Sequence, residues 1–201
     1  MMWKAAFFIL LSLSTGCTAY PRLPSENCPV KLIHTSDLPQ DLSLRAQVQL
    51  QKGKHRINFE AIAESKSGVL TLVGIAPYGT RLFQIQQKEG KIHFSELDSS
   101  INRSLAIFTM DALYRAYWIR TPSKEASWDY ANEIVTEGSH HNERYREFRQ
   151  SGPREASSSV KIDYGFESGD RMTAVTTIEN PWCGYSASII QLKNNSGNQE
   201  P

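Results

Sequence analysis

Residues 42–51 alternate strictly between apolar and polar side chains, and this alternation constrains the fold more than any other feature of the chain. The apolar positions are Leu42, Leu44, Ala46, Val48 and Leu50. A period of two places successive side chains on opposite faces of a strand, so one face is apolar and the other is polar. That division is typical of an antiparallel sheet with one face against a core.

Four more strands are predicted directly after this one, each set off by a short turn. They cover residues 57–63, 69–75, 81–87 and 91–97. Five neighbouring strands joined by short turns form an up-and-down meander. Residues 69–75 are almost all apolar, which predicts that this strand is buried on both faces.

The period changes after residue 104. Residues 105–118 are mostly apolar at helical spacing and predict a helix that lies across the concave face of a curved sheet. Residues 121–159 are polar, with short strands expected only around residues 134–135 and 145–148. Alternation returns at residues 160–164, 172–178 and 186–192, and residues 193–201 form a loose polar tail. The predicted fold is therefore mainly β (α+β), a curved antiparallel sheet with one helix.

The first 16 residues have the pattern of an export signal. Lys4 supplies a positive charge, residues 5–13 are apolar apart from Ser12, and small residues follow up to Cys17. The apolar run is too short to span a bilayer. The alternative is an N-terminal helix packed in the core, but the run shows no second, polar face.

Residues 13–17 resemble the lipobox of bacterial lipoproteins, although Ser14 stands where that family prefers Leu. The resemblance implies cleavage before Cys17 and attachment of a diacylglycerol and an acyl chain such as palmitate to this residue. One acyl chain binds a membrane marginally, whereas two or three hold firmly. Thr18, in place of the Asp that retains such proteins at the inner membrane, implies the periplasmic face of the outer membrane. Residues 17–41, with four prolines, would be the tether.

The charge balance excludes one large class of partner. The chain has 22 Lys+Arg and 21 Asp+Glu, and removal of residues 1–16 with Lys4 leaves 21 of each. Nucleic-acid binders usually show a basic excess, so no nucleic-acid partner is predicted. Attachment to a membrane must then depend on acyl chains rather than on basic residues.

Two cysteines remain once Cys17 is assigned to lipid. The periplasm permits disulfides, and a bridge between Cys28 and Cys183 would tie the tether to the last hairpin. Two unrelated free thiols are the alternative. Neither cysteine has a neighbour at metal-ligand spacing, so we predict no metal site and no cofactor.

Signatures of catalysis are weak. The sequence has no Gly-x-Ser-x-Gly, no phosphate loop and no His-Glu-x-x-His. Ser158 and Lys161 match Ser-x-x-Lys, but the companion motifs of serine acyl enzymes are missing. His140 and His141 fit an exposed polar loop better than a metal site. We therefore expect no enzyme activity. Residues 77–81 fit either a contact loop or a plain tight turn.

Three stretches invite comparison with a known family. They are residues 74–83 at the centre of the meander, Tyr117-Trp118 at the end of the helix, and the closing hairpin at residues 178–185. With the lipobox they resemble a family of proteobacterial lipoproteins with a domain of unknown function, whose layout is similar to LolB, the outer-membrane lipoprotein receptor. The resemblance covers most of residues 42–192, although the polar insert at 121–159 departs from the compact LolB pattern. It implies a LolA/LolB-like incomplete β-barrel with a helical lid and an apolar cavity for acyl chains.

Two hypotheses follow for function. In the first, the protein is a non-catalytic outer-membrane lipoprotein that binds or accepts a lipid or acylated ligand, because burial of apolar surface contributes roughly 25 cal/mol per Å². The candidate cavity residues are Leu82, Phe83, Ile92, Phe94, Leu113, Tyr117 and Trp118. The alternative packing is a barrel filled completely by the helix and side chains. In the second hypothesis, a sheet edge pairs with another envelope protein in a structural or assembly role.

Overall fold

The computed structural model describes residues 30, 34–38, 42–99, 101–119, 127–130, 132–140, 143–151, 159–165 and 175–192. Eleven strands form one antiparallel sheet in the order β5-β4-β3-β2-β1-β11-β10-β9-β8-β7-β6. The strands are β1 (Ser43–Lys52), β2 (His55–Lys66), β3 (Val69–Ile75), β4 (Arg81–Lys88), β5 (Lys91–Leu97), β6 (Ser127–Tyr130), β7 (Glu133–His140), β8 (Glu143–Gln150), β9 (Val160–Tyr164), β10 (Val175–Asn180) and β11 (Tyr185–Gln191).

Two meanders, β1–β5 and β6–β11, meet in the middle of the sheet. They are joined by the pairing of β1 with β11, which runs from Ala46 opposite Gln191 to Lys52 opposite Tyr185. The end strands β5 and β6 are not neighbours in the described sheet, so it stays open. The predicted mainly β fold with an open antiparallel sheet is confirmed.

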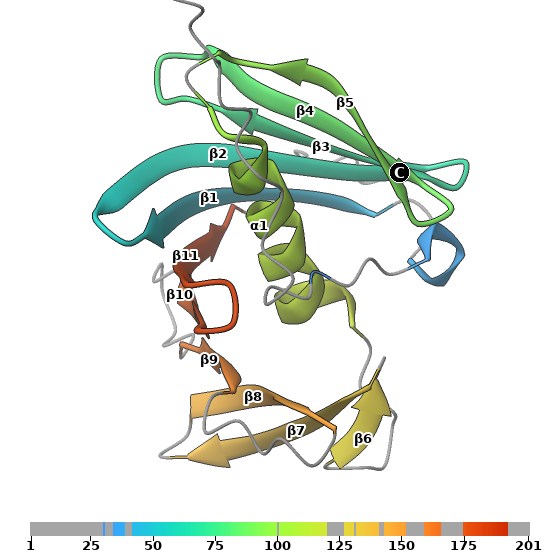
Figure 1. Ribbon diagram of the computed structural model, residues 1–201, viewed down its shortest axis with the longest axis vertical. Helices are drawn as coiled ribbons and strands as arrows, with labels where there is room; N and C mark the ends of the chain where they lie inside the picture. The colour runs from blue at the N-terminus through green and yellow to red at the C-terminus, as the bar shows by residue number, and fades with distance from the viewer. Residues whose placement is uncertain are drawn as a thin grey trace, which may run out of the picture.

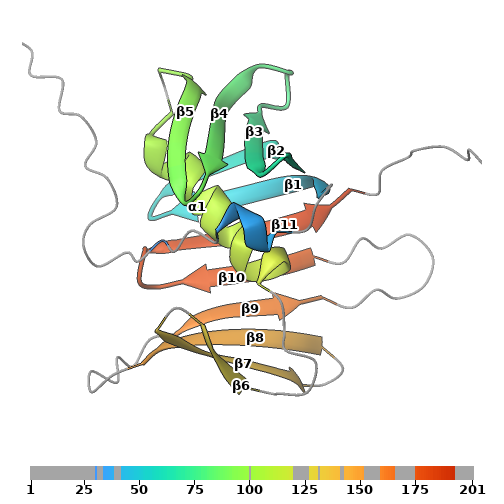
Figure 2. The ribbon, with the colours of Figure 1, turned by 90° about the vertical axis from the view of Figure 1, so that its right-hand side faces the viewer.

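One helix lies in the hollow of this sheet. It comprises α1 (Arg103–Leu113) and a π-helical turn, η2 (Tyr114–Trp118), and it follows β5 in the chain. The sheet curves around it, with β1–β5 on one side and β6–β9 on the other (Figure 1). The second view shows α1 crossing the strands in front of β11 and β10 (Figure 2). The opening between β5 and β6 therefore falls where the helix is inserted in the sequence.

Small residues on the inner face let the helix pack closely. Ala46, Ala61 and Ala63 of the sheet are fully buried, as are Ala106 and Ala112 of α1. Beside them Gly74 leaves room for the ring of Phe83, which would lie only 2.4 Å from a Cβ at that position. Every residue from Ala106 to Ala116 is buried, so the helix belongs to the core.

Most predicted strands are confirmed, and β3, β5 and β9 have the predicted bounds. The expectation for β3 is wrong in one respect, because only its inner face is fully buried. Val69, Val73 and Ile75 point outward and are half-buried, since Val73 pairs across the outer face with Ile62 of β2. The polar stretch 121–159 holds three strands, β6–β8, and β6 was not predicted.

The segment before β1 also contributes to the domain. A 3₁₀ turn, η1 (Thr35–Asp37), lies at the β4–β5 turn, where Thr35 Oγ1 accepts a hydrogen bond of 3.3 Å from the backbone N–H of Glu89. Thr35 is buried, and Leu38 belongs to the core. Cys17, Cys28 and the predicted signal peptide (1–16) and tail (193–201) lie outside the described residues.

Candidate functional site

The helix that fills the hollow has a defined start and an unusual end. At its start Asn102 accepts a hydrogen bond of 2.9 Å from the backbone N–H of Ser104, which satisfies one of the free N–H groups of the first turn. At its end the N–H of Ile119 bonds to the carbonyl of Tyr114 at 3.0 Å, five residues back. Such π turns often occur at functional sites.

A buried charge cluster fixes this end of the helix to the second meander. It comprises Asp111, Arg115, Glu133, Glu137 and Arg146. Arg115 lies 3.1 Å from Asp111 and 2.8 Å from Glu133 of β7, and Arg146 of β8 donates to the backbone carbonyl of Arg115 at 2.7 Å. Arg146 also donates from Nε to Glu137 at 2.6 Å. Two guanidinium groups thus face three carboxyl groups, of which those of Asp111 and Glu133 are buried and that of Glu137 is partly buried.

Burial and neighbouring charges shift the pKa values of Asp111 and Arg115 in opposite directions. Burial raises the pKa of Asp111, and it outweighs the opposing effects of Arg115 and of the hydrogen bond from Tyr185. Burial lowers the pKa of Arg115, but attraction to Asp111 and the bond to Glu133 raise it above the usual value. Arg115 is therefore a permanent buried cation, and its removal would leave acids without compensation.

Further hydrogen bonds join the helix to β9, β10 and β11. Tyr185 and Asn180 donate to the same oxygen of Asp111 at 2.7 Å and 3.1 Å. Tyr164 donates to the carbonyl of Ala116 at 2.8 Å, and Tyr117 donates to Thr176 at 3.1 Å. The C-terminal half of the helix is thus held by polar bonds to the second meander.

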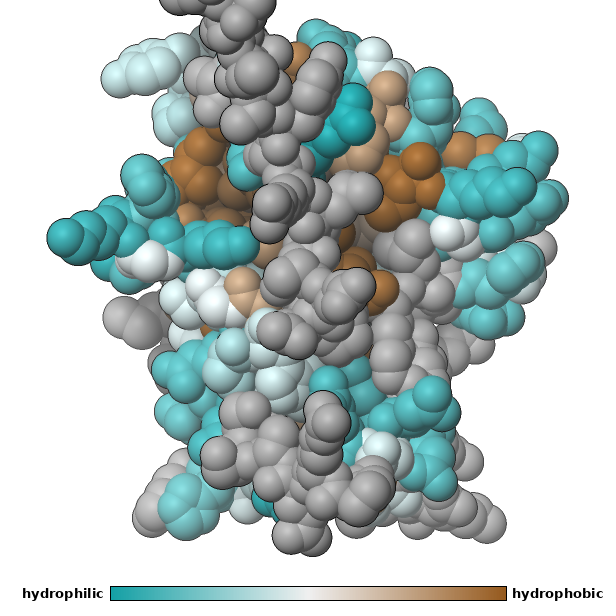
Figure 3. All heavy atoms as spheres, in the orientation of Figure 1, coloured by the Kyte–Doolittle hydropathy of each residue, from teal (hydrophilic) through white to brown (hydrophobic). Residues whose placement is uncertain are grey.

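The side of the helix toward β5 is different, because partly buried apolar residues gather there. We call this set the β5–α1 seam; its members are Ile92, Phe94, Leu97, Ile101 and Leu105, which pack against the core without being enclosed. The guanidinium of Arg103 lies 5.2 Å from the ring of Phe94. Hydrophobic surface gathers over the upper half of the molecule, where α1 and β1–β5 lie, whereas the described surface over β6–β9 is mostly hydrophilic (Figure 3).

A buried hydrogen bond joins the helix to the first meander. Tyr114, at the start of η2, donates a hydrogen bond to Gln87 of β4, and both side chains are buried. Phe108 stacks on Tyr185 of β11 at 5.0 Å, with the ammonium of Lys52 4.4 Å from its ring. Tyr185 belongs to the second meander, so the first meander contacts the helix through the Tyr114–Gln87 bond, through Lys52 and through the apolar core.

The predicted cavity residues divide into two groups. Leu82, Phe83, Leu113 and Trp118 are enclosed in the core, whereas Ile92, Phe94 and Tyr117 are partly buried at its margin. Ile92 and Phe94 belong to the seam. Tyr117 lies on the opposite side of the helix, bonded to β10.

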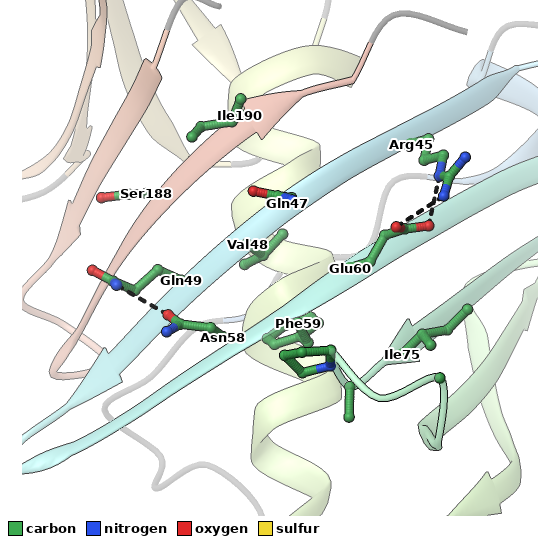
Figure 4. A pocket seen from close by; sticks show the side chains of 13 residues that line it. Arg45, Gln47, Val48, Gln49, Asn58, Phe59, Glu60, Ile75, Ser188 and Ile190 are labelled. Carbon is green, nitrogen blue, oxygen red and sulfur yellow. Dashed lines mark hydrogen bonds and ion pairs between the residues drawn. The ribbon is translucent and has the colours of Figure 1, made fainter. Parts of the chain in front are cut away.

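A groove runs over the outer face of β11, β1 and β2, and we call it the outer groove. It encloses about 820 Å³, and the β3–β4 turn with Ala76, Pro77 and Gly79 borders it. Its polar side chains project from neighbouring strands and include two bonded pairs (Figure 4). Arg45 binds Glu60 through two hydrogen bonds of 2.6 Å and 3.0 Å, and Gln49 donates to Asn58 at 3.0 Å.

The remaining predictions concern cysteine, histidine and serine. Cys183 is buried and disulfide-bonded; Cys28 lies outside the described residues, so the pairing itself stays a prediction. His140 is exposed at the end of β7, and neither His141 nor Ser158 is described. Among the described residues, no group of three His, Cys, Asp or Glu side chains is placed to hold a metal.

Sequence reasoning missed the charge cluster, although one signal was present. Asp111 and Arg115 are four residues apart in a stretch that is otherwise almost wholly apolar, and this spacing puts both on one helix face. Two opposite charges inside an apolar helix indicate a buried ion pair. Their partners on β7 and β8 are distant in sequence and carry no such signal.

Comparisons with other proteins give one result for the family. Within the described ranges, no helix is long and apolar enough to cross a membrane. A comparison with curated proteins finds no match for this chain. A family model described as "Protein of unknown function (DUF3261)" matches residues 43–193, from the start of β1 to just beyond the end of β11. The chain therefore belongs to the DUF3261 family.

Proposed function

We propose that this protein is a lipid-anchored, non-catalytic binding module that takes an acyl chain of a lipid or acylated ligand at the β5–α1 seam. The observation that carries the proposal is the seam itself. Five partly buried apolar residues lie together at the margin of the core, beside the open edge of the sheet. The expected site is an incomplete LolA/LolB-like barrel, with Cys17 as the lipid attachment at the periplasmic face of the outer membrane.

The distribution of polar bonds indicates which side of the helix can open. Separating α1 from β7–β11 would break buried ion pairs and leave charges uncompensated, at a cost of about 3–5 kcal/mol. Separating the seam exposes apolar surface that an acyl chain can cover again, at roughly 25 cal/mol per Å². We therefore expect β5 to part from the helix, while α1 stays with the second meander and with β4, to which Tyr114 is hydrogen-bonded through Gln87.

Photocrosslinking tests the proposed site. The full-length protein in nanodiscs is treated with a diazirine-bearing palmitate, and labelled peptides are mapped by mass spectrometry. We expect labels in residues 91–118 and strongly reduced labelling in Phe94→Gln, because a polar group there disfavours an acyl chain. The matched control is Val73→Gln, a half-buried apolar residue on the outer face of β3. Labelling that is confined elsewhere, or that Phe94→Gln leaves unchanged, would contradict the proposal.

The anchor needs a separate test. In the intact mass of the mature protein we expect a lipid-modified Cys17 as the first residue, and in Cys17→Ser an unprocessed chain without acyl groups. An unmodified N-terminus at another position would refute lipidation without bearing on the seam.

The open sheet supports a second candidate, a structural or assembly factor. The described sheet ends at β5 and β6, and an end strand presents backbone groups that can pair with an added strand. Ser95 is an exposed residue of the end strand β5. This role would be favoured by a co-purified envelope protein that no longer binds when Ser95 is replaced by proline. Ser99→Pro, beyond the end of β5, is the control.

A further inference from the structure

We infer that the outer groove is a binding site for an uncharged carbohydrate, separate from the acyl site. The groove lies on the face of the sheet opposite the helix. Gln47 and Gln49 of β1 point outward, whereas the intervening Val48 belongs to the core that packs on α1. A ligand in the groove would therefore not compete with a ligand at the seam.

The charge of the groove favours a neutral ligand. Arg45 and Glu60 are its charged lining residues, and they neutralise each other through two hydrogen bonds of 2.6 Å and 3.0 Å. An anionic ligand would have to displace Glu60, and a cationic one would have to displace Arg45. An uncharged ligand can use the remaining donors and acceptors of both groups without breaking the pair.

The other polar groups of the groove suit sugar hydroxyls. A hydroxyl both donates and accepts, and a side-chain amide offers a donor and an acceptor side by side. Gln49 and Asn58 use one group each in their mutual bond of 3.0 Å, which leaves a carbonyl of Gln49 and an amino group of Asn58. In the part of the chain that the structure describes, the side chains of Gln47 and Ser188 have no hydrogen-bond partner.

Apolar surface borders these polar groups on both sides. Ile190 of β11 and Ile75 of β3 are half-buried lining residues, and Pro77 stands in the β3–β4 turn. Between Pro77 and Gly79, Tyr78 is 97% exposed, so its ring is free to cover a ligand. The C–H faces of sugar rings pack on aliphatic and aromatic side chains, while their hydroxyls bind the amides. The groove provides both kinds of contact within about 820 Å³, which is the size range of small-molecule sites.

Saturation-transfer difference NMR tests this inference on the full-length protein in nanodiscs, with empty nanodiscs as the blank. The probes are four neutral trisaccharides, namely maltotriose, cellotriose, mannotriose and triacetylchitotriose, and one anionic probe, trigalacturonate. We expect saturable transfer to at least one neutral probe, with a Kd of about 1–10 mM because the groove is open. We expect Gln47→Ala and Asn58→Ala each to weaken binding about five-fold, the equivalent of one hydrogen bond.

Two variants complete the design. Gln84→Ala, on the outer face of β4 and outside the groove lining, is the matched control and should leave binding unchanged. Tyr78→Ala should reduce transfer to the ring protons of the sugar. Absence of saturable transfer with every neutral probe, preference for trigalacturonate, or equal effects of Gln47→Ala and Gln84→Ala would each overturn the inference. None of these outcomes bears on acyl labelling at the seam.

Discussion

Two Arg–Glu pairs show how burial changes the value of the same interaction. Arg115 and Glu133 have side chains that are 3% and 1% exposed, whereas those of Arg45 and Glu60 are 55% and 24% exposed. We predict that Arg115→Met lowers the free energy of unfolding by about 3–5 kcal/mol, because Asp111 and Glu133 lose their cation inside the core. Urea denaturation measures the change.

The exposed pair supplies the matched control for this prediction. Arg45→Met removes the same charge and bonds from a surface pair, where water and salt replace them. Its unfolding curve should therefore stay close to that of the wild type. Equal losses in the two variants would show that the buried cluster does not stabilise the fold as argued.

The contact of Gly74 with Phe83 predicts a steric effect of a single methyl group. A Cβ at position 74 would lie 2.4 Å from the Phe83 ring, and the φ angle there is not in the left-handed region. Gly74→Ala should therefore destabilise the domain by about 1–3 kcal/mol through overpacking. In the double variant Gly74→Ala/Phe83→Leu we expect part of this loss to return. Additive losses would contradict the steric explanation.

Tyr164 gives a prediction about alkaline pH. Burial raises its pKa from 10.0 to about 12. Between pH 10 and about pH 12 the unfolded chain binds fewer protons than the folded one, so the free energy of unfolding falls as pH rises. This residue accounts for at most about 3 kcal/mol of that fall. At pH 8 the variant Tyr164→Phe should be less stable than the wild type, because the bond to Ala116 is lost. From pH 9 to 11.5, however, it should lose less stability than the wild type. Urea curves across that range measure both effects, and parallel pH profiles would refute the assignment.

At the scale of the element, the start of α1 depends on one side chain. Asn102 is the N-cap, and its side chain accepts from the N–H of Ser104 at 2.9 Å. Asn102→Ala should cost about 1 kcal/mol, whereas Asn102→Asp keeps the acceptor and should cost little. Thermal unfolding of the two variants, compared at the same pH, measures the difference. Equal melting temperatures for Asn102→Ala and Asn102→Asp would show that the side chain at the N-cap does not stabilise the helix.

Alternation predicted the strands well wherever the inner face is apolar. This holds for β1, whose inner positions are all apolar from Leu44 to Leu50. In β7 and β8 it indicates only short strands around residues 134–135 and 145–148, because the positions that face the helix include Glu133 and Arg146. A strand with buried charges loses the apolar period that marks it in the sequence. The charge cluster could not be predicted for a second reason, since it joins the helix to strands that are distant in the chain.

At the scale of the whole molecule, the pairing of β1 with β11 brings the two ends of the domain together. Each of these strands is visible in the sequence, but nothing local marks them as partners, because register depends on the two faces that they share. The pairing places the 181–184 turn next to the turn between β1 and β2, because Tyr185 lies opposite Lys52 at the end of β1. A covalent link at Cys183 would therefore act on the central pair of the sheet rather than on a free end.

The disulfide of Cys183 carries the last prediction. Cys183 is buried and bonded, and a partner at Cys28 would close a loop that spans almost the whole domain. Such a loop restricts the unfolded chain strongly, so Cys28→Ser and Cys183→Ser should each lower stability by about 3–5 kcal/mol. The double variant should lose no more than either single one, because one bond is removed in all three. Thermal unfolding with thiol titration in denaturant tests this, and two free thiols in the wild type or additive single losses would rule the pairing out.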